Sequence, residues 1–331
     1  MPGFPLEAED IASYAKKSPE LGVILISTEL KRIADDYVQE DVRAIEAQGR
    51  FSKVAAHLNA AVLATAVVGS LILALGLLLP WFQLKEWKWL VDASPWALRL
   101  LGLVGLLVGG YSAARLYELN AGDLAGLWMK SRARAEKLRS DYFDRLAARA
   151  VKEGAAARTA AINLVCLHLL DHQLDYFTKR GLRHEKAAGR WLGWAAFATG
   201  VASVGVAAGG MAGTANQPWI LVVAALGTIG GAAAAFATSQ ATIGQEKERG
   251  QRFRNNRAAL SELARKIDDV TAAVAGESPE ALVTFTNGIN QQLALELGQF
   301  LDGGESIRAS ITKLGEEIEK AAKKDDKPGG G

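Results

Sequence analysis

The chain has 331 residues, of which 38 are Lys or Arg and 36 are Asp or Glu, so its formal net charge is only +2. This balance and the lack of a known nucleic-acid-binding motif argue against a nucleic-acid partner. The single cysteine, Cys166, excludes an internal disulfide framework. The sequence has no P-loop, no Rossmann glycine fingerprint and no nucleophile elbow, so it predicts neither an enzyme nor a bound cofactor.

Two long stretches, residues 54–84 and 191–245, contain no Lys, Arg, Asp or Glu. A helix that crosses a bilayer needs about 20 predominantly apolar residues, more than most apolar runs in soluble proteins. A buried helical hairpin of a soluble domain is the alternative for the second stretch. We expect four membrane spans, at residues 58–81, 96–117, 191–212 and 219–241.

The predicted spans divide the chain into six parts. The N-terminal helical region, residues 1–57, contains the helix start Ser18-Pro19-Glu20, with Ser as the cap and Pro at the first position. The other parts are a first hairpin (58–117), central helices (118–190), a second hairpin (191–241), C-terminal helices (242–322) and a tail (323–331). The tail is charged and then Gly-rich, and we expect it to be disordered.

The C-terminal region shows several helix signals. Apolar residues from Leu260 to Val274 follow heptad spacing over about two heptads. Ser278-Pro279-Glu280 predicts another helix start, and Asp302-Gly303-Gly304 predicts a helix break. No segment alternates as a strand would. The expected fold class is all-α: a four-span helical membrane protein, with two transmembrane hairpins and long cytoplasmic helical extensions.

The positive charges predict the orientation. Residues 115–190 hold 15 Lys or Arg and 9 Asp or Glu, whereas residues 211–218 hold no charge. Positive residues near span ends stay cytoplasmic. We therefore expect a multi-pass protein of the cytoplasmic (inner) membrane with both termini in the cytoplasm. Seven of the eight Trp lie at the predicted membrane interfaces, where amphipathic rings prefer to be.

Small residues recur every four positions in three of the spans, so each set shares one helix face. Such faces let helix backbones approach closely. They predict a surface for oligomerisation or gating, while packing within the chain's own four helices is the alternative. Gly105, Gly109 and Ala113 match Gly227, Gly231 and Ala235 in spacing, which suggests an internal duplication of the hairpin. The third set is Gly205, Gly209 and Gly213.

Two basic clusters follow the second and fourth spans at matching spacing. They are candidates for binding anionic lipid headgroups or a ligand such as a nucleotide. The alternative is that they only fix the orientation of the spans. The clusters are Arg132, Arg134 and Lys137, and Arg252, Arg254 and Arg257.

One set of side chains is a weak candidate for a metal site. His168, His172 and Asp175 are four and three residues apart, so one face of an α-helix would carry all three. Leucines alternate with them, and a polar helix face is the simpler interpretation. We predict no resident metal.

The arrangement of two spans followed by Trp128-Met129-Lys130-Ser131-Arg132-Ala133-Arg134-Ala135-Glu136-Lys137-Leu138-Arg139 resembles the SLATT families. These are two-span effector domains associated with SMODS and SLOG domains in bacterial conflict systems. The resemblance covers about residues 44–274 as a tandem of two modules, although Gly250 to Leu260 lacks the Ala-Glu pair. It implies a pore-forming or membrane-disrupting effector that a nucleotide-linked signal releases.

The spans themselves lack ionisable residues at mid-membrane, which argues against a transporter. We therefore expect a membrane effector that forms homo-oligomers and permeabilises the membrane when a cytoplasmic signal arrives. The alternative is a non-conducting scaffold or sensor that docks a soluble signalling partner through its cytoplasmic helices.

Overall fold

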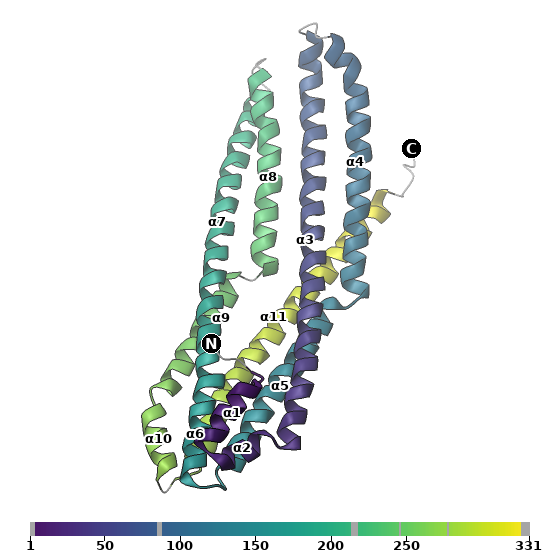
Figure 1. Ribbon diagram of the computed structural model, residues 1–331. Coiled ribbons are helices and arrows are strands. Elements are labelled where there is room, and N and C mark those ends of the chain that lie inside the picture. Colours follow the sequence, from purple (N-terminus) through teal and green to yellow (C-terminus); the bar gives the residue numbers. More distant parts are fainter. Residues whose placement is uncertain (1–3, 85–87, 213–217, 245, 277, 326–331) are drawn as a thin grey trace. The chain divides into compact units, whose positions relative to one another are not determined.

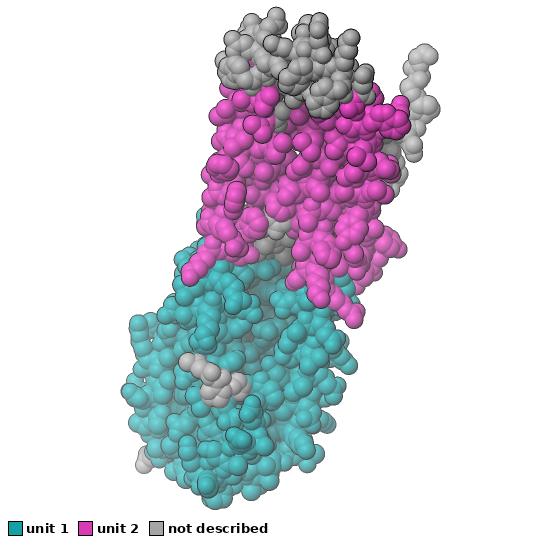
Figure 2. Space-filling model, turned by 45° about the horizontal axis from the view of Figure 1, so that its top comes forward, with its two compact units in different colours: residues 1–49, 124–185, 247–309 teal, residues 50–123, 186–246, 310–331 magenta. Residues whose placement is uncertain are grey.

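A computed structural model describes residues 4–84, 88–212, 218–244, 246–276 and 278–325. This part of the chain is almost entirely helical and contains no strand, so the all-α prediction is confirmed for it (Figure 1). The chain forms two compact units (Figure 2). Unit 1 comprises residues 1–49, 124–185 and 247–309, and unit 2 comprises residues 50–123, 186–246 and 310–331.

The helices follow one another with short connections, and one π-helical segment interrupts them. In chain order they are α1 (Ala8–Lys17), α2 (Pro19–Leu25), α3 (Thr28–Leu84), α4 (Lys88–Ala121), α5 (Leu124–Ala150), α6 (Ala155–Val165), the π-helix η1 (Cys166–Asp171), α7 (His172–Ala212), α8 (Pro218–Gly244), α9 (Glu246–Ala264), α10 (Ile267–Ala275) and α11 (Ala281–Asp325). Helices α3 and α7 contribute residues to both units.

Unit 1 has a core of fully buried apolar side chains that come from many helices. Phe143 of α5, Ile162 of α6, Leu260 of α9 and Ile289 of α11 all belong to it. Burial of such a side chain contributes about 1.5–3 kcal/mol. Helix α2 packs on α5 and α6, so the N-terminal region is part of this core.

The start of α2 follows directly from its sequence. The Ser18 hydroxyl accepts a hydrogen bond from the backbone N–H of Leu21 at 3.3 Å, and Pro19 is the first helical residue. This geometry satisfies one of the free N–H groups at the helix start. The helix start predicted at Ser18-Pro19-Glu20 is confirmed.

Unit 2 contains two helical hairpins, α3 with α4 and α7 with α8 (Figure 1). Many of their large apolar side chains face outward: Leu106 is 72% exposed, Val206 76% and Phe197 66%. Within the part of the chain that the structure describes, three helical stretches are long and apolar enough to cross a membrane, namely Thr28–Gly76, Ala93–Ala150 and Ala155–Ala208. The apolar stretch of α8, Val222–Thr238, is shorter.

One sequence-based expectation about the C-terminal region is wrong. Helix α11 does not break at Asp302-Gly303-Gly304 but continues to Asp325. A Cβ on Gly304 would overlap Met129 of α5, so this glycine serves close helix packing. The heptad run from Leu260 to Val274 is split, because α9 ends at Ala264 and α10 begins at Ile267.

The residues of that heptad run pack into the core of unit 1. Of the predicted tail, residues 323–325 belong to α11, and residues 326–331 lie outside the described residues.

Candidate functional site

The α7–α8 hairpin has a backbone-to-backbone contact at two glycines. A Cβ built on Gly205 would lie 2.6 Å from the backbone nitrogen of Gly227 and 3.0 Å from the carbonyl oxygen of Val223. Gly230 is similarly close, because its Cβ would lie 2.8 Å from the nitrogen of Ala202. No side chain fits at these positions, so packing within the chain uses part of the predicted small-residue faces.

Other members of those faces are open. A Cβ on Gly109 or Gly231 would meet no atom within 4 Å, and Ala113 is exposed. Gly105 lies against Val68 of α3, where a Cβ would stand 3.3 Å from the side chain. The predicted faces therefore divide into packing positions and free positions. Gly209, Gly213 and Ala235 lie outside the residues whose side chains are described.

Hydroxyl groups in the hairpins bond to their own helices. Thr65 and Ser70 of α3, Ser112 of α4 and Thr199 of α7 each donate to the carbonyl oxygen four residues earlier, at 2.8–2.9 Å. A polar side chain that satisfies itself in this way is compatible with an apolar surrounding.

The first basic cluster does not form one surface. In unit 1, Glu136 bridges two guanidinium groups of α5, because its carboxylate pairs with Arg132 at 2.6 Å and with Arg139. The side chain of Arg139 is only 6% exposed. Burial disfavours the charge of Arg132, but Glu136 and other nearby acidic groups overcome this and raise its pKa.

The remaining members of that cluster are exposed. Arg134 is 69% exposed and lies 3.9 Å from Glu40 of α3, and Lys137 faces solvent. The second cluster is divided in the same way. Arg252 donates to the carbonyl oxygen of Gln299 in α11 at 2.5 Å, Arg254 pairs with Glu185 of α7 at 2.5 Å, and Arg257 is exposed.

Acidic side chains from two other helices lie near these arginines. Glu296 of α11 and Asp41 of α3 both have a raised pKa, mainly because burial disfavours their charge. Arg132 acts on both carboxyl groups in the opposite direction. Opposite charges from α3, α5 and α11 thus share one partly buried network inside unit 1.

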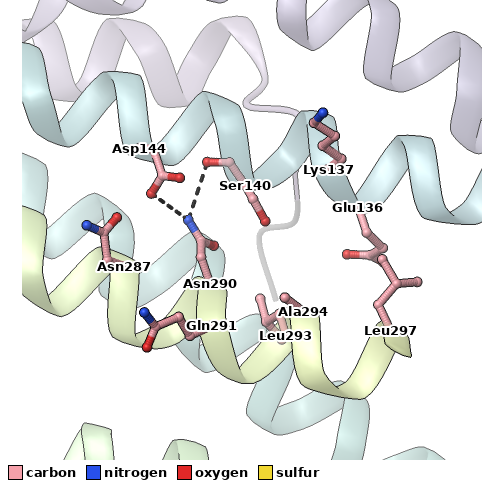
Figure 3. A pocket seen from close by; sticks show the side chains of 10 residues that line it. All are labelled: Glu136, Lys137, Ser140, Asp144, Asn287, Asn290, Gln291, Leu293, Ala294 and Leu297. Carbon is pink, nitrogen blue, oxygen red and sulfur yellow. Dashed lines mark hydrogen bonds between the residues drawn. The ribbon is translucent and has the colours of Figure 1, made fainter. Parts of the chain in front are cut away.

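A groove of about 450 Å³ lies between α5 and α11, next to this network (Figure 3). Asn290 is buried, and its Nδ2 donates to Oδ1 of Asp144 at 2.7 Å and to the carbonyl oxygen of Ser140 at 3.3 Å. Among the residues that the structure describes, the Oδ1 atom of Asn290 has no hydrogen-bond partner. The groove is lined by Glu136, Lys137, Ser140, Asp144, Asn287, Asn290, Gln291, Leu293, Ala294 and Leu297.

Sequence reasoning did not find this groove. Asn290 and Asp144 are 146 residues apart in the chain, and neither belongs to a motif. The only sequence signal is a run of amide residues, Asn287, Asn290 and Gln291, on neighbouring turns of a predicted helix.

The weak metal candidate does not form a site. His168 lies inside η1, and His172 follows it directly. Asp175 pairs with Lys179 at 2.6 Å. Within the described residues, no three His, Cys, Asp or Glu side chains are grouped to hold a metal ion.

Comparison of the chain with protein-family models, curated proteins and solved structures gives no significant match.

Proposed function

We propose that this chain is a four-span effector of the bacterial cytoplasmic membrane that assembles with further copies and permeabilises the membrane on a cytoplasmic signal. The observation that carries the proposal is the outward-facing apolar surface of unit 2. Leu106, Val206 and Trp96 are each more than two thirds exposed. Contact with lipid tails carries no free-energy cost for these apolar side chains, whereas contact with water is unfavourable for them.

The open glycines support assembly. Gly109 and Gly231 present bare backbone on hairpin faces that no other part of the described chain covers within 4 Å of a Cβ position. In a membrane, such faces favour close contact between helices of separate copies. The resemblance to SLATT effectors points to the same activity and to bacterial defence as its setting.

The proposal is tested by membrane depolarisation in bacteria, with a voltage-sensitive dye after brief induction. Wild-type protein should depolarise the cells, and Gly231→Leu should not, at equal amounts in the membrane. Ala207→Leu is the control, because Ala207 is exposed on α7 but does not belong to the small-residue face that begins at Gly205. Equal depolarisation by Gly231→Leu and wild type would show that the helix face of Gly231 has no role in assembly.

A second candidate function is a non-conducting membrane scaffold. Three apolar residues on α3, in unit 1, favour it: Val38 is 41% exposed, Val42 48% and Ile45 60%. They are four and three residues apart, so they share one helix face. A soluble partner could dock on this face. The scaffold predicts that wild-type protein leaves the membrane potential unchanged and that Ile45→Lys abolishes capture of that partner.

A further inference from the structure

The groove between α5 and α11 contains a carboxylate without a cation. Asp144 accepts one hydrogen bond, from Asn290 at 2.7 Å, and within the described residues no Lys, Arg or His lies within ion-pair distance of it. Burial and the charge of Asp141 raise the pKa of Asp144, against the hydrogen bond from Asn290. A cation bound at this point would relieve both effects.

A second acceptor lies beside this carboxylate. Asn290 is only 8% exposed and lines the groove, and among the described residues its Oδ1 atom has no hydrogen-bond partner. A buried carbonyl oxygen without a donor is unfavourable. Both groups accept hydrogen bonds, so they fit a ligand group that carries several N–H donors, such as a guanidinium or an ammonium group.

The opposite end of the groove carries the opposite charge. Lys137 is exposed and lies seven residues before Asp144 on α5, which corresponds to about 10 Å along a helix. Figure 3 shows the two side chains at opposite ends of the α5 wall. Ala294 and Leu297 of α11 give the groove an apolar part. Glu136 adds no free charge, because it pairs with Arg132 and Arg139.

We propose that this groove binds a small zwitterion of the basic amino acid class. Its guanidinium or ammonium group lies at Asp144 and Asn290, its methylene stem contacts Ala294 and Leu297, and its carboxylate lies at Lys137. The volume of about 450 Å³ falls in the range of small-molecule sites. The inference rests on unit 1 alone, and it holds whether or not the protein conducts.

Calorimetric titration of the full chain in detergent micelles tests the proposal, with L-arginine as the probe. Wild-type protein should bind L-arginine, and Asp144→Asn should weaken binding about tenfold or more, because a charge-assisted hydrogen bond is lost. Lys137→Gln should weaken it less, since Lys137 is exposed. Asp141→Asn is the matched control: this carboxylate is one turn from Asp144 but does not line the groove, and its loss should change the affinity less than threefold.

Two analogues of L-arginine test the two ends of the groove separately. L-citrulline is neutral where L-arginine is charged, so it should bind at least tenfold more weakly. Agmatine lacks the carboxylate, so Lys137→Gln should not weaken its binding. No heat of binding with L-arginine, equal affinity for L-citrulline, or unchanged affinity in Asp144→Asn would each overturn the proposal. Unchanged melting temperatures of the variants exclude misfolding as the cause of any loss.

Discussion

Gly205 of α7 and Gly227 of α8 meet so closely that a Cβ on either residue would overlap the backbone of the other. The overlap involves backbone atoms, which cannot rotate away as the end of a side chain can. The two helices therefore approach to a separation that only glycine permits at this point.

This contact predicts that Gly205→Ala destabilises the α7–α8 hairpin. Overpacking by one methyl group costs about 1–3 kcal/mol where the surrounding atoms cannot move. The measurement is thermal unfolding of the purified protein in detergent. Gly231→Ala is the control, because a Cβ there meets no atom within 4 Å. Equal melting temperatures for the two variants would contradict the contact.

Removal of the negative charge of Glu136 should destabilise unit 1. Glu136→Gln leaves Arg132 and the buried Arg139 without their shared carboxylate. Loss of one partner of a buried ion pair costs about 3–5 kcal/mol. Denaturant unfolding measures the change.

Glu262→Gln provides the comparison for Glu136. Glu262 pairs with Arg265 at 2.7 Å, with side chains that are 64% and 74% exposed. Exposed pairs of this kind contribute little to stability. If both variants unfold at the same denaturant concentration as wild type, the Glu136 network has no structural role.

Glu296 predicts a pH dependence with a definite sign. Burial raises the pKa of Glu296 above its ordinary value of 4.5, while Arg132, Arg252 and Arg139 oppose the rise and Glu136 adds to it. The folded state therefore holds this proton more tightly than the unfolded state. Protonation of Glu296 therefore stabilises the folded state. This stabilisation appears as the pH falls through the raised pKa, and it is fully present below the ordinary value of 4.5.

Wild-type protein should accordingly gain stability relative to Glu296→Gln as the pH is lowered from 7 to 5. Chemical unfolding of both proteins at several pH values gives the difference. A relative loss of stability in wild type over this range would show that the arginines dominate and that the pKa is lowered.

The number of spans is open to a direct labelling experiment. With four spans, both ends of the chain lie on the same side of the membrane, and with three spans they lie on opposite sides. In a Cys166→Ser background, Glu7→Cys and Glu305→Cys should both resist a membrane-impermeant maleimide in intact cells. Ala93→Cys, three residues before the second predicted span, should react. Labelling of only one terminus would establish an odd number of spans.

The sequence was a good guide to local structure. Apolar periodicity predicted helices, and Ser18-Pro19 predicted the start of α2, because both signals act over a few neighbouring residues. The long uncharged stretches likewise predicted long apolar helices.

Contacts between distant segments were not predictable in this way. Gly303-Gly304 resembles a helix break, but α11 continues through these residues, and Gly304 lies against the side chain of Met129. The spacing of basic residues grouped Arg132 with Arg134 and Lys137, whereas in the structure Arg132 pairs with Glu136 in the network of unit 1. The groove at Asn290 depends on a partner 146 residues away. Single-sequence patterns contain no information about such pairs.

The π-helix η1 also explains an unusual row of buried residues in unit 1. Ala157, Ala161, Val165, Leu169, Gln173, Phe177 and Gly181 are all buried at intervals of four. In a straight α-helix each interval of four would turn the row by about 40° around the axis.

The extra residue of a π turn reverses about 100° of that drift. The segment from α6 through η1 to α7 therefore contains one residue more than a straight α-helix would need to place the same side chains on the core. Removal of one residue from η1, such as the half-exposed Leu167, would close the turn into an ordinary α-helix and leave both flanks facing the core. The π-helix η1 thus has the geometry of a one-residue insertion into an α-helix that leaves the packing of both flanking helices unchanged.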